Sequence, residues 1–141
     1  MSRAGYSDDL DPLDLGRWRA QVLSALRGKR GQAFLRDLIA ALDAMPEKRL
    51  VSGDLQDETG CVCALGALGK HRGVDLEKLD TYDYDQLGRT FDIAHQLAQE
   101  VMYENDEGFW RHDSPEGRWR HMRNWAANSL NVDKNVSELQ R

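Results

Sequence analysis

Apolar residues recur every three or four positions in the first third of the chain, which is the period of an amphipathic helix. One such run follows Asp14, a residue type that caps helices, and extends to about Arg27. A second run begins near Gln32 and reaches Ala44, and Pro46 stops it. We expect the two helices to pack as an antiparallel hairpin around a short basic loop. Their apolar faces consist of Leu15, Trp18, Val22 and Leu26 in the first helix and Leu35, Leu38, Ile39, Leu42 and Met45 in the second.

The helical period disappears after Lys48. Two short apolar stretches, residues 50–51 and 61–63, flank the turn-forming residues 57–60, whose sequence is Asp-Glu-Thr-Gly. This order is compatible with a short β-hairpin near residues 49–63.

Residues 64–72 regain helical character, and Gly73 is a natural terminator. Gly66 and Gly69 lie inside this helix, where each costs about 1 kcal/mol relative to alanine. Close packing against a neighbouring element can compensate for such glycines, so we expect this helix to be tightly packed. The next stretch, residues 74–91, places apolar residues among aspartates and predicts one short helix between loops.

Two further helices are predicted in the C-terminal third. Asp92 can cap the first, which Asn105 and Gly108 end. The second opens at residues 114–116, Ser-Pro-Glu, which combine a cap residue, a proline suited to the first turn and an acid favoured by the helix dipole. Its core-facing residues are Trp119, Met122, Trp125, Ala126 and Leu130.

Together these elements predict a predominantly α fold, with about five helices around a single hydrophobic core. A chain of 141 residues has the size at which one core is the rule, so we expect a single domain over residues 1–141. Residues 1–13 are predicted to be a flexible acidic lead-in, and the polar residues 131–141 a frayed tail.

The compartment follows from composition and from the cysteines. No apolar run reaches the roughly 18 residues that span a bilayer, and the N-terminus lacks the apolar stretch of a signal peptide. Cys61 and Cys63 are too close in sequence to staple a fold, which is consistent with free thiols in a reducing compartment. We therefore expect a cytoplasmic protein without membrane association.

Charge is unevenly distributed along this chain, whose net charge is −5. Residues 16–36 contain arginine and lysine but no acidic residue, whereas residues 74–107 are rich in aspartate and glutamate. Nucleic-acid binding usually requires a basic domain, so the net charge argues against it. The candidates for such a site are the basic residues near Trp18, although Trp18 itself fits the apolar helical face. These residues are Arg17, Arg27, Lys29 and Arg30.

The two cysteines and the acidic stretches are the residues to consider for a catalytic or a metal site. Cys63 precedes a predicted helix whose dipole would lower the thiol pKa, and His71 or His95 could act as its base. The alternative is that Cys63 is a small apolar residue packed in the core. The Cys61-x-Cys63 spacing does not suit a zinc site, and the acidic stretches do not follow the calcium-loop pattern. We therefore expect no metal and no cofactor.

Four motifs resemble a family of small proteins carried by tailed bacteriophages and prophages. They are PEKRL at residues 46–50, CALGALG at residues 63–69, FDIA at residues 91–94 and YENDE at residues 103–107. The resemblance extends over roughly residues 16–128. It implies action in the cytosol of an infected bacterium, but it implies no activity and no catalytic residue.

Several functions remain open at this point. The first is a small phage-encoded accessory protein that acts without catalysis by binding a host bacterial protein, for example as an anti-CRISPR or other anti-defence inhibitor. The alternative is a small cysteine-dependent enzyme centred on Cys63, and nucleic-acid binding through residues 17–36 is a weaker one. The sequence does not distinguish a monomer from a homodimer. Candidate residues for binding the partner, chosen for negative charge and aromatic anchoring, are Asp83, Tyr84, Asp85, Glu104, Asp106, Glu107 and Trp110.

Overall fold

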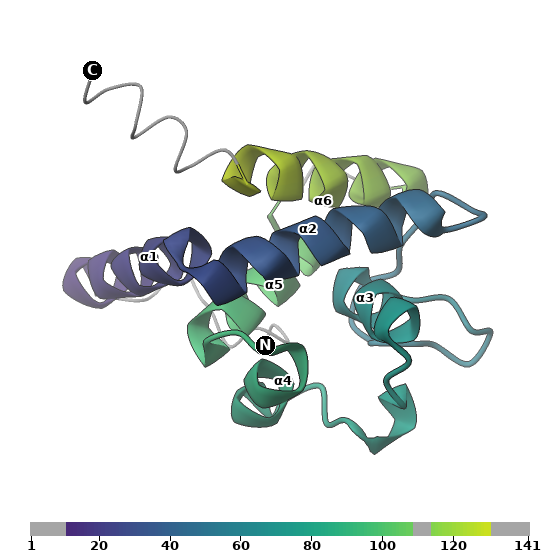
Figure 1. Cartoon of the computed structure of the whole chain (residues 1–141), viewed down its shortest axis with the longest axis horizontal. Helices are drawn as coiled ribbons and strands as arrows, with labels where there is room; N and C mark the ends of the chain where they lie inside the picture. The colour runs from purple at the N-terminus through teal and green to yellow at the C-terminus, as the bar shows by residue number, and fades with distance from the viewer. Residues whose placement is uncertain (1–10, 109–113, 131–141) are drawn as a thin grey trace.

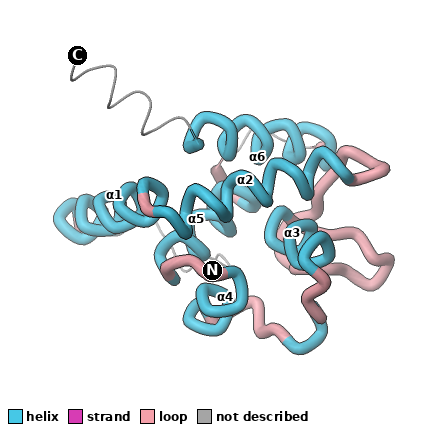
Figure 2. The backbone as a smooth tube through the Cα atoms, viewed as in Figure 1, coloured by secondary structure: helices cyan, strands magenta, loops and turns pink. Residues whose placement is uncertain are grey.

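The computed structural model describes residues 11–108 and 114–130 (Figure 1, Figure 2). These residues form six α-helices and one short 3-10 helix, with no strand among them. The predicted predominantly α fold is therefore confirmed. The predicted tail, most of the predicted lead-in and the pair Phe109-Trp110 lie outside the described residues. The elements are α1 (Pro12–Arg27), α2 (Lys29–Ala44), α3 (Ala64–Arg72), η1 (Leu76–Lys78), α4 (Tyr84–Phe91), α5 (His95–Asp106) and α6 (Pro115–Leu130).

The first helix begins before its predicted cap. Asp11 accepts a hydrogen bond from the backbone N–H of Leu13 at 2.8 Å, and Pro12 occupies the first turn. Proline suits this position because its backbone angle is already helical and it has no N–H to satisfy. Asp14, the predicted cap, lies in the first turn of α1 instead. The predicted lead-in to residue 13 was therefore too long.

The prediction of an antiparallel hairpin for α1 and α2 was wrong. Only Gly28 separates the two helices, and they run end to end in Figure 1. Gly31 permits this tight junction, because a Cβ atom there would lie 1.9 Å from the carbonyl oxygen of Ala25. As a result α1 packs mainly against α5, and α2 packs against α6 and α3.

The segment between α2 and α3 is an irregular loop with a single antiparallel bridge between Gln56 and Val62. The backbone N–H of Val51 also donates to the carbonyl of Val62 at 2.9 Å, and that of Cys63 to the carbonyl of Leu55 at 3.2 Å. The predicted β-hairpin is thus reduced to isolated pairings. They hold the loop against the start of α3.

Asp92 ends one helix rather than capping the next. It adopts the left-handed conformation, with φ of 56°, at the C-terminus of α4. Aspartate tolerates this conformation better than most residues do. The following helix, α5, starts at His95 with Ala94 at its cap position and no side-chain cap hydrogen bond. The sequence therefore predicted the helix correctly but not its cap.

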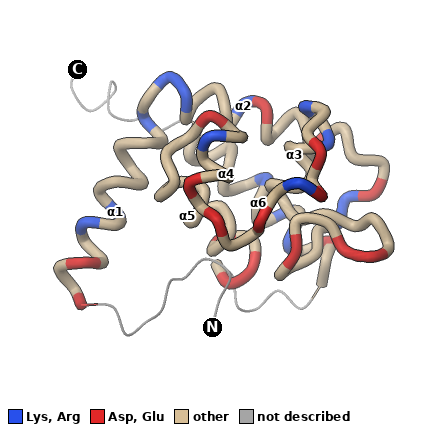
Figure 3. Tube along the Cα trace, turned by 90° about the horizontal axis from the view of Figure 1, so that it is seen from below, with Lys and Arg blue, Asp and Glu red and all other residues tan. Residues whose placement is uncertain are grey.

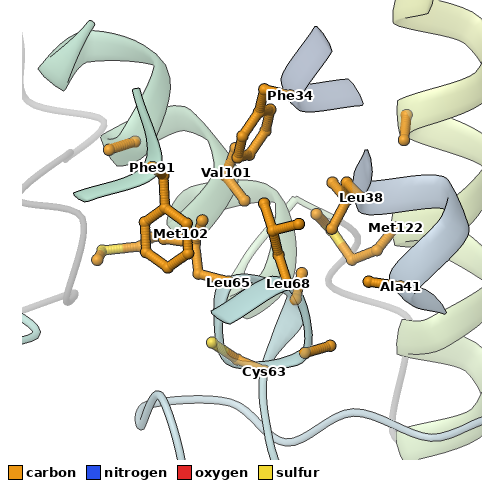
Figure 4. Close-up of a cluster of buried hydrophobic side chains, with 14 of the residues drawn as sticks. Phe34, Leu38, Ala41, Cys63, Leu65, Leu68, Phe91, Val101, Met102 and Met122 are labelled. Carbon is orange, nitrogen blue, oxygen red and sulfur yellow. The ribbon is translucent and has the colours of Figure 1, made fainter. Parts of the chain in front are cut away.

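The core lies where α2, α3, α5 and α6 meet, and its side chains converge in Figure 4. Phe34, Leu68 and Met122 are among its fully buried members. The glycines of α3 allow the close packing predicted for them. A Cβ atom at Gly66 would lie 2.0 Å from the carbonyl oxygen of Leu55, and one at Gly69 would lie 2.6 Å from the Leu76 side chain.

One buried polar residue connects the loop, α3 and α5. Asn105 is 3% exposed, and its Oδ1 accepts a hydrogen bond from the backbone N–H of Ala64 at 3.0 Å. Its Nδ2 donates to the carbonyl of Val51 at 3.0 Å and to Asp106 Oδ1 at 2.8 Å. Since Ala64 begins α3, the side chain of Asn105 fixes that helix on the end of α5.

Candidate functional site

A hollow of about 660 Å³ lies where the start of α4 meets α5. We call it the acidic–aromatic hollow. Its lining residues are Asp80, Tyr82, Asp83, Tyr84, Asp85, His95 and Gln99. Three of the predicted partner-binding residues, the consecutive Asp83, Tyr84 and Asp85, line this hollow.

The aspartates fix the local backbone of this hollow. Asp80 Oδ1 accepts a hydrogen bond from the backbone N–H of Tyr82 at 2.9 Å, and Asp83 Oδ1 accepts one from that of Gln86 at 3.0 Å, which caps α4. Gln86 in turn accepts the backbone N–H of Asp80 at 2.9 Å through its side-chain oxygen. The turn is thereby held in place and leaves Tyr82 64% exposed.

The electrostatics of the hollow are negative. Asp83 and Asp85 are exposed carboxylates, and the one basic side chain in the lining is a histidine, whose Nδ1 lies 3.7 Å from Asp85 Oδ1. This histidine, His95, is charged only when protonated. Figure 3 shows acidic residues on and around α4, and the basic junction of α1 and α2 reaches the end of that helix, where Arg30 lies 3.3 Å from Asp92. The arrangement suits an aromatic contact combined with recognition of positive charge.

The other predicted acidic residues do not join this hollow. Glu104, Asp106 and Glu107 lie at the C-terminal end of α5, whereas His95 and Gln99 line the hollow from its first half. Asp106 is used structurally, because its Oδ1 accepts the backbone N–H of Gly53 at 3.2 Å. Trp110 lies outside the described residues. The single acidic surface expected from the sequence is thus two separate groups.

Comparison with known proteins assigns no family to this fold or to the hollow. No protein-family model, no curated protein and no solved structure matches this chain. What the hollow can bind therefore follows from its geometry and charge.

The basic candidates for nucleic-acid binding are exposed but partly engaged. Arg17 lies 3.9 Å from Asp14, and Arg30 lies 3.3 Å from Asp92. Trp18 is half-buried and donates its indole N–H to Glu100 at 3.2 Å, so its ring edge is committed to the protein. Arg27 and Lys29 are exposed near the junction of α1 and α2. On this surface the basic side chains lie beside a tryptophan whose indole N–H is already used within the protein.

Cys63 lies in the core rather than in a cleft. Its side chain is part of the cluster in Figure 4, and the residue is 1% exposed. The sulfur accepts the backbone N–H of Gly66 at 3.5 Å, which caps α3. His71 and His95, the predicted bases, are both exposed. The structure therefore favours the packing role over the catalytic one.

The second cysteine has different surroundings. Cys61 is half-buried and lines a cleft of about 630 Å³ between the end of α2, the loop and α3, where Thr59 Oγ1 donates to its sulfur at 3.4 Å. Within residues 11–108 and 114–130, no group of three metal-binding side chains is placed to hold an ion. No helix in the same part of the chain is long and apolar enough to cross a membrane.

The structure also reveals a polar cluster that the sequence did not predict. Glu100 on α5 accepts the indole N–H of Trp18 from α1, and Glu104 Oε1 lies 3.0 Å from His121 Nε2 of α6. Burial raises the pKa of Glu100 to about 7, and repulsion from the neighbouring carboxylate of Glu104 adds to the rise. The Trp18 hydrogen bond and the charge of Arg19 oppose it.

A signal for this cluster was present in the sequence. Glu100 and Glu104 are four residues apart and so share one side of a helix, where like charges repel. Glu100 also directly precedes Val101, which is fully buried. An acidic pair beside the apolar face of a helix indicates half-buried carboxylates. Their partners on α1 and α6 are distant in sequence and could not be found from it.

Proposed function

We propose that this protein acts without catalysis as a binding protein, and that its acidic–aromatic hollow receives a basic segment of a partner protein. The observation that carries this proposal is the exposed ring of Tyr82 beside the exposed carboxylates of Asp83 and Asp85. Exposed aromatic residues next to charge are typical of residues that dominate binding energy.

Charge complementarity supports a basic partner. A negative hollow on a protein of net charge −5 attracts positively charged surfaces and accelerates their association at low ionic strength. The hydrogen bonds of Asp80 and Asp83 hold the turn before binding, so little conformational entropy is lost when the partner docks. The resemblance to phage and prophage proteins supports a host bacterial protein as the partner, in a role such as inhibition of a host defence.

The test is affinity capture from a bacterial lysate with matched variants. Asp85→Arg and Tyr82→Ala alter the hollow without removing the caps provided by Asp80 and Asp83. Glu107→Arg makes the same charge reversal at an exposed position on the far end of α5.

We expect the wild type and Glu107→Arg to retain the same partner, with capture that weakens as salt increases. Asp85→Arg and Tyr82→Ala should lose at least about tenfold in capture, the effect of removing a residue that dominates binding. Equal capture of that partner by all four proteins would exclude the hollow as the binding surface.

A further inference from the structure

A second cavity of about 490 Å³ lies between α1 and α6, with α5 at its base. It shares no lining residue with the acidic–aromatic hollow. Most of its exposed surface is apolar, and two tryptophans contribute to it. We call it the tryptophan groove. Its lining residues are Trp18, Arg19, Val22, Leu23, Leu26, Glu100, His121, Asn124, Trp125, Asn128 and Ser129.

Above about pH 7 the groove carries the negative charge of the half-buried Glu100. Glu100 accepts a hydrogen bond from the neutral indole of Trp18, and it also shares a hydrogen bond with a second acid, Glu104. His121 Nε2 lies 3.0 Å from Glu104 Oε1. Arg19 acts on Glu100 through its charge, and it is an exposed residue at the edge of the groove. The pKa of Glu100 is about 7, above its ordinary value of 4.5. Burial and the second acid therefore raise this pKa by more than the charge of Arg19 lowers it.

The walls suit a short hydrocarbon chain. Val22 and Leu26 are buried parts of the α1 wall, and Leu23 remains 43% exposed although it is a large apolar residue. Tryptophan is the aromatic side chain that attracts cations most strongly, and Trp18 and Trp125 both line the groove. A ligand with an apolar stem and a positively charged head would bury apolar surface and neutralise Glu100 at the same time.

We propose that the tryptophan groove binds an organic cation, namely a guanidinium or primary ammonium group on a short alkyl chain, with Glu100 as the anionic partner of the head group. A bare metal ion is disfavoured, because no group of three metal-binding side chains is placed to hold one within the described residues. A guanidinium can instead form two parallel hydrogen bonds to one carboxylate. Asn124 and Asn128, both exposed on α6, add side-chain carbonyl oxygens at the rim.

Binding of such a cation is coupled to a proton. Below pH 7 Glu100 holds a proton, and the arriving cation must release it to solvent. If only the ionised form binds, the affinity should rise about tenfold between pH 6 and pH 8. Glu104 and Arg19 act on Glu100 through their charges, and His121, which contacts Glu104, lines the same groove. They are present in the wild type and in the variant used below.

The experiment is a titration with N-butylguanidinium, followed by tryptophan fluorescence and by NMR of the indole N–H groups. N-butylurea is the matched neutral probe, since it has nearly the same shape without the charge. Glu100→Gln removes the carboxylate and keeps an oxygen that can accept the Trp18 N–H. Glu107→Gln is the control on the same helix, because Glu107 is exposed and absent from the groove lining.

We expect saturable binding of N-butylguanidinium to the wild type and to Glu107→Gln, with the indole signal of Trp18 shifting. Glu100→Gln should bind at least about tenfold more weakly and lose the pH dependence. N-butylurea should bind no more tightly to the wild type than to Glu100→Gln. Absence of saturable binding to the wild type, or affinity that does not change between pH 6 and pH 8, would overturn the proposal. The titration of the wild type alone can overturn the proposal, even if the Glu100→Gln variant fails to fold.

Two further probes distinguish the sources of the cation. Agmatine represents a free amine, and N-acetyl-arginine methylamide represents an arginine side chain of a protein. If agmatine binds more tightly than the blocked arginine, the natural ligand of the groove is a free amine. If the blocked arginine binds more tightly, the ligand is an arginine side chain of a protein. Failure of both probes to bind would overturn the proposed site. Failure here leaves the proposed function intact, because Tyr82 and Asp85 lie in the other hollow.

Discussion

At the scale of single residues, Asn105 shows how one amide can organise the protein. Its side chain satisfies a backbone N–H at the start of α3 and a backbone carbonyl in the preceding loop. Buried backbone groups without partners are expensive, so this residue stabilises two segments at once. The sequence predicted only that Asn105 would help to end a helix.

We predict that Asn105→Ala destabilises the protein by about 2–4 kcal/mol, because it leaves the N–H of Ala64 and the carbonyl of Val51 without their partner. Urea denaturation followed by circular dichroism measures this free energy. Asn128→Ala, at an exposed position on α6, is the control and should change stability by less than about 0.5 kcal/mol. Equal effects of the two substitutions would contradict the assigned role.

Glu100 gives a second prediction at this scale. Its pKa is raised from 4.5 to about 7 in the folded protein, so the folded state binds more protons than the unfolded state between these values. The stability contribution of this group is therefore present at low pH and lost as the pH rises towards 7. Glu100→Gln should raise the melting temperature at pH 8 and have a smaller effect at pH 5. Thermal melts at the two pH values test this, and a larger gain at pH 5 would refute it.

At the scale of elements, the hydrophobic period located the helices, but their ends depended on details that the pattern does not contain. Pro12 and Asp11 extended α1 towards the N-terminus, and Asp92 became the end of α4. A cap depends on the conformation of a single residue, whereas a helical face is repeated over several turns. The relative direction of α1 and α2 also escaped prediction, because it depends on how closely Gly31 approaches Ala25.

The glycines provide a matched test at this scale. Gly66→Ala places a methyl group against the carbonyl of Leu55 and should cost about 1–3 kcal/mol. Gly16, within α1, has open space where a methyl group would lie, with no atom within 4 Å, so Gly16→Ala should stabilise the protein by about 0.5–1 kcal/mol. Chemical denaturation of both variants measures the two free energies. A stabilising Gly66→Ala would show that α3 does not pack closely against the loop.

At the scale of the whole molecule, most residues of the apolar faces predicted from the sequence lie in the core or pack against it. The predicted acidic surface, in contrast, is not a single surface. Asp83 and Asp85 lie at one end of α5, and Glu107 lies at the other. The sequence could not show that these two acidic groups lie apart in space, because both belong to the same acidic segment of the chain. The tryptophan groove escaped prediction for a related reason: Trp18 and Glu100 are brought together only by the packing of α1 on α5.

The central claim is that the acidic–aromatic hollow is the surface that meets a partner. Photo-crosslinking tests it most directly, with p-benzoylphenylalanine replacing Tyr82 in one protein and Leu13 in another. Leu13 is 70% exposed and lies in α1, so it is a matched exposed position outside the hollow. We predict a discrete cross-linked partner from position 82 that disappears when Asp85→Arg is added, and none from position 13. The same cross-linked partner from position 13, or no cross-link from position 82, would contradict the claim.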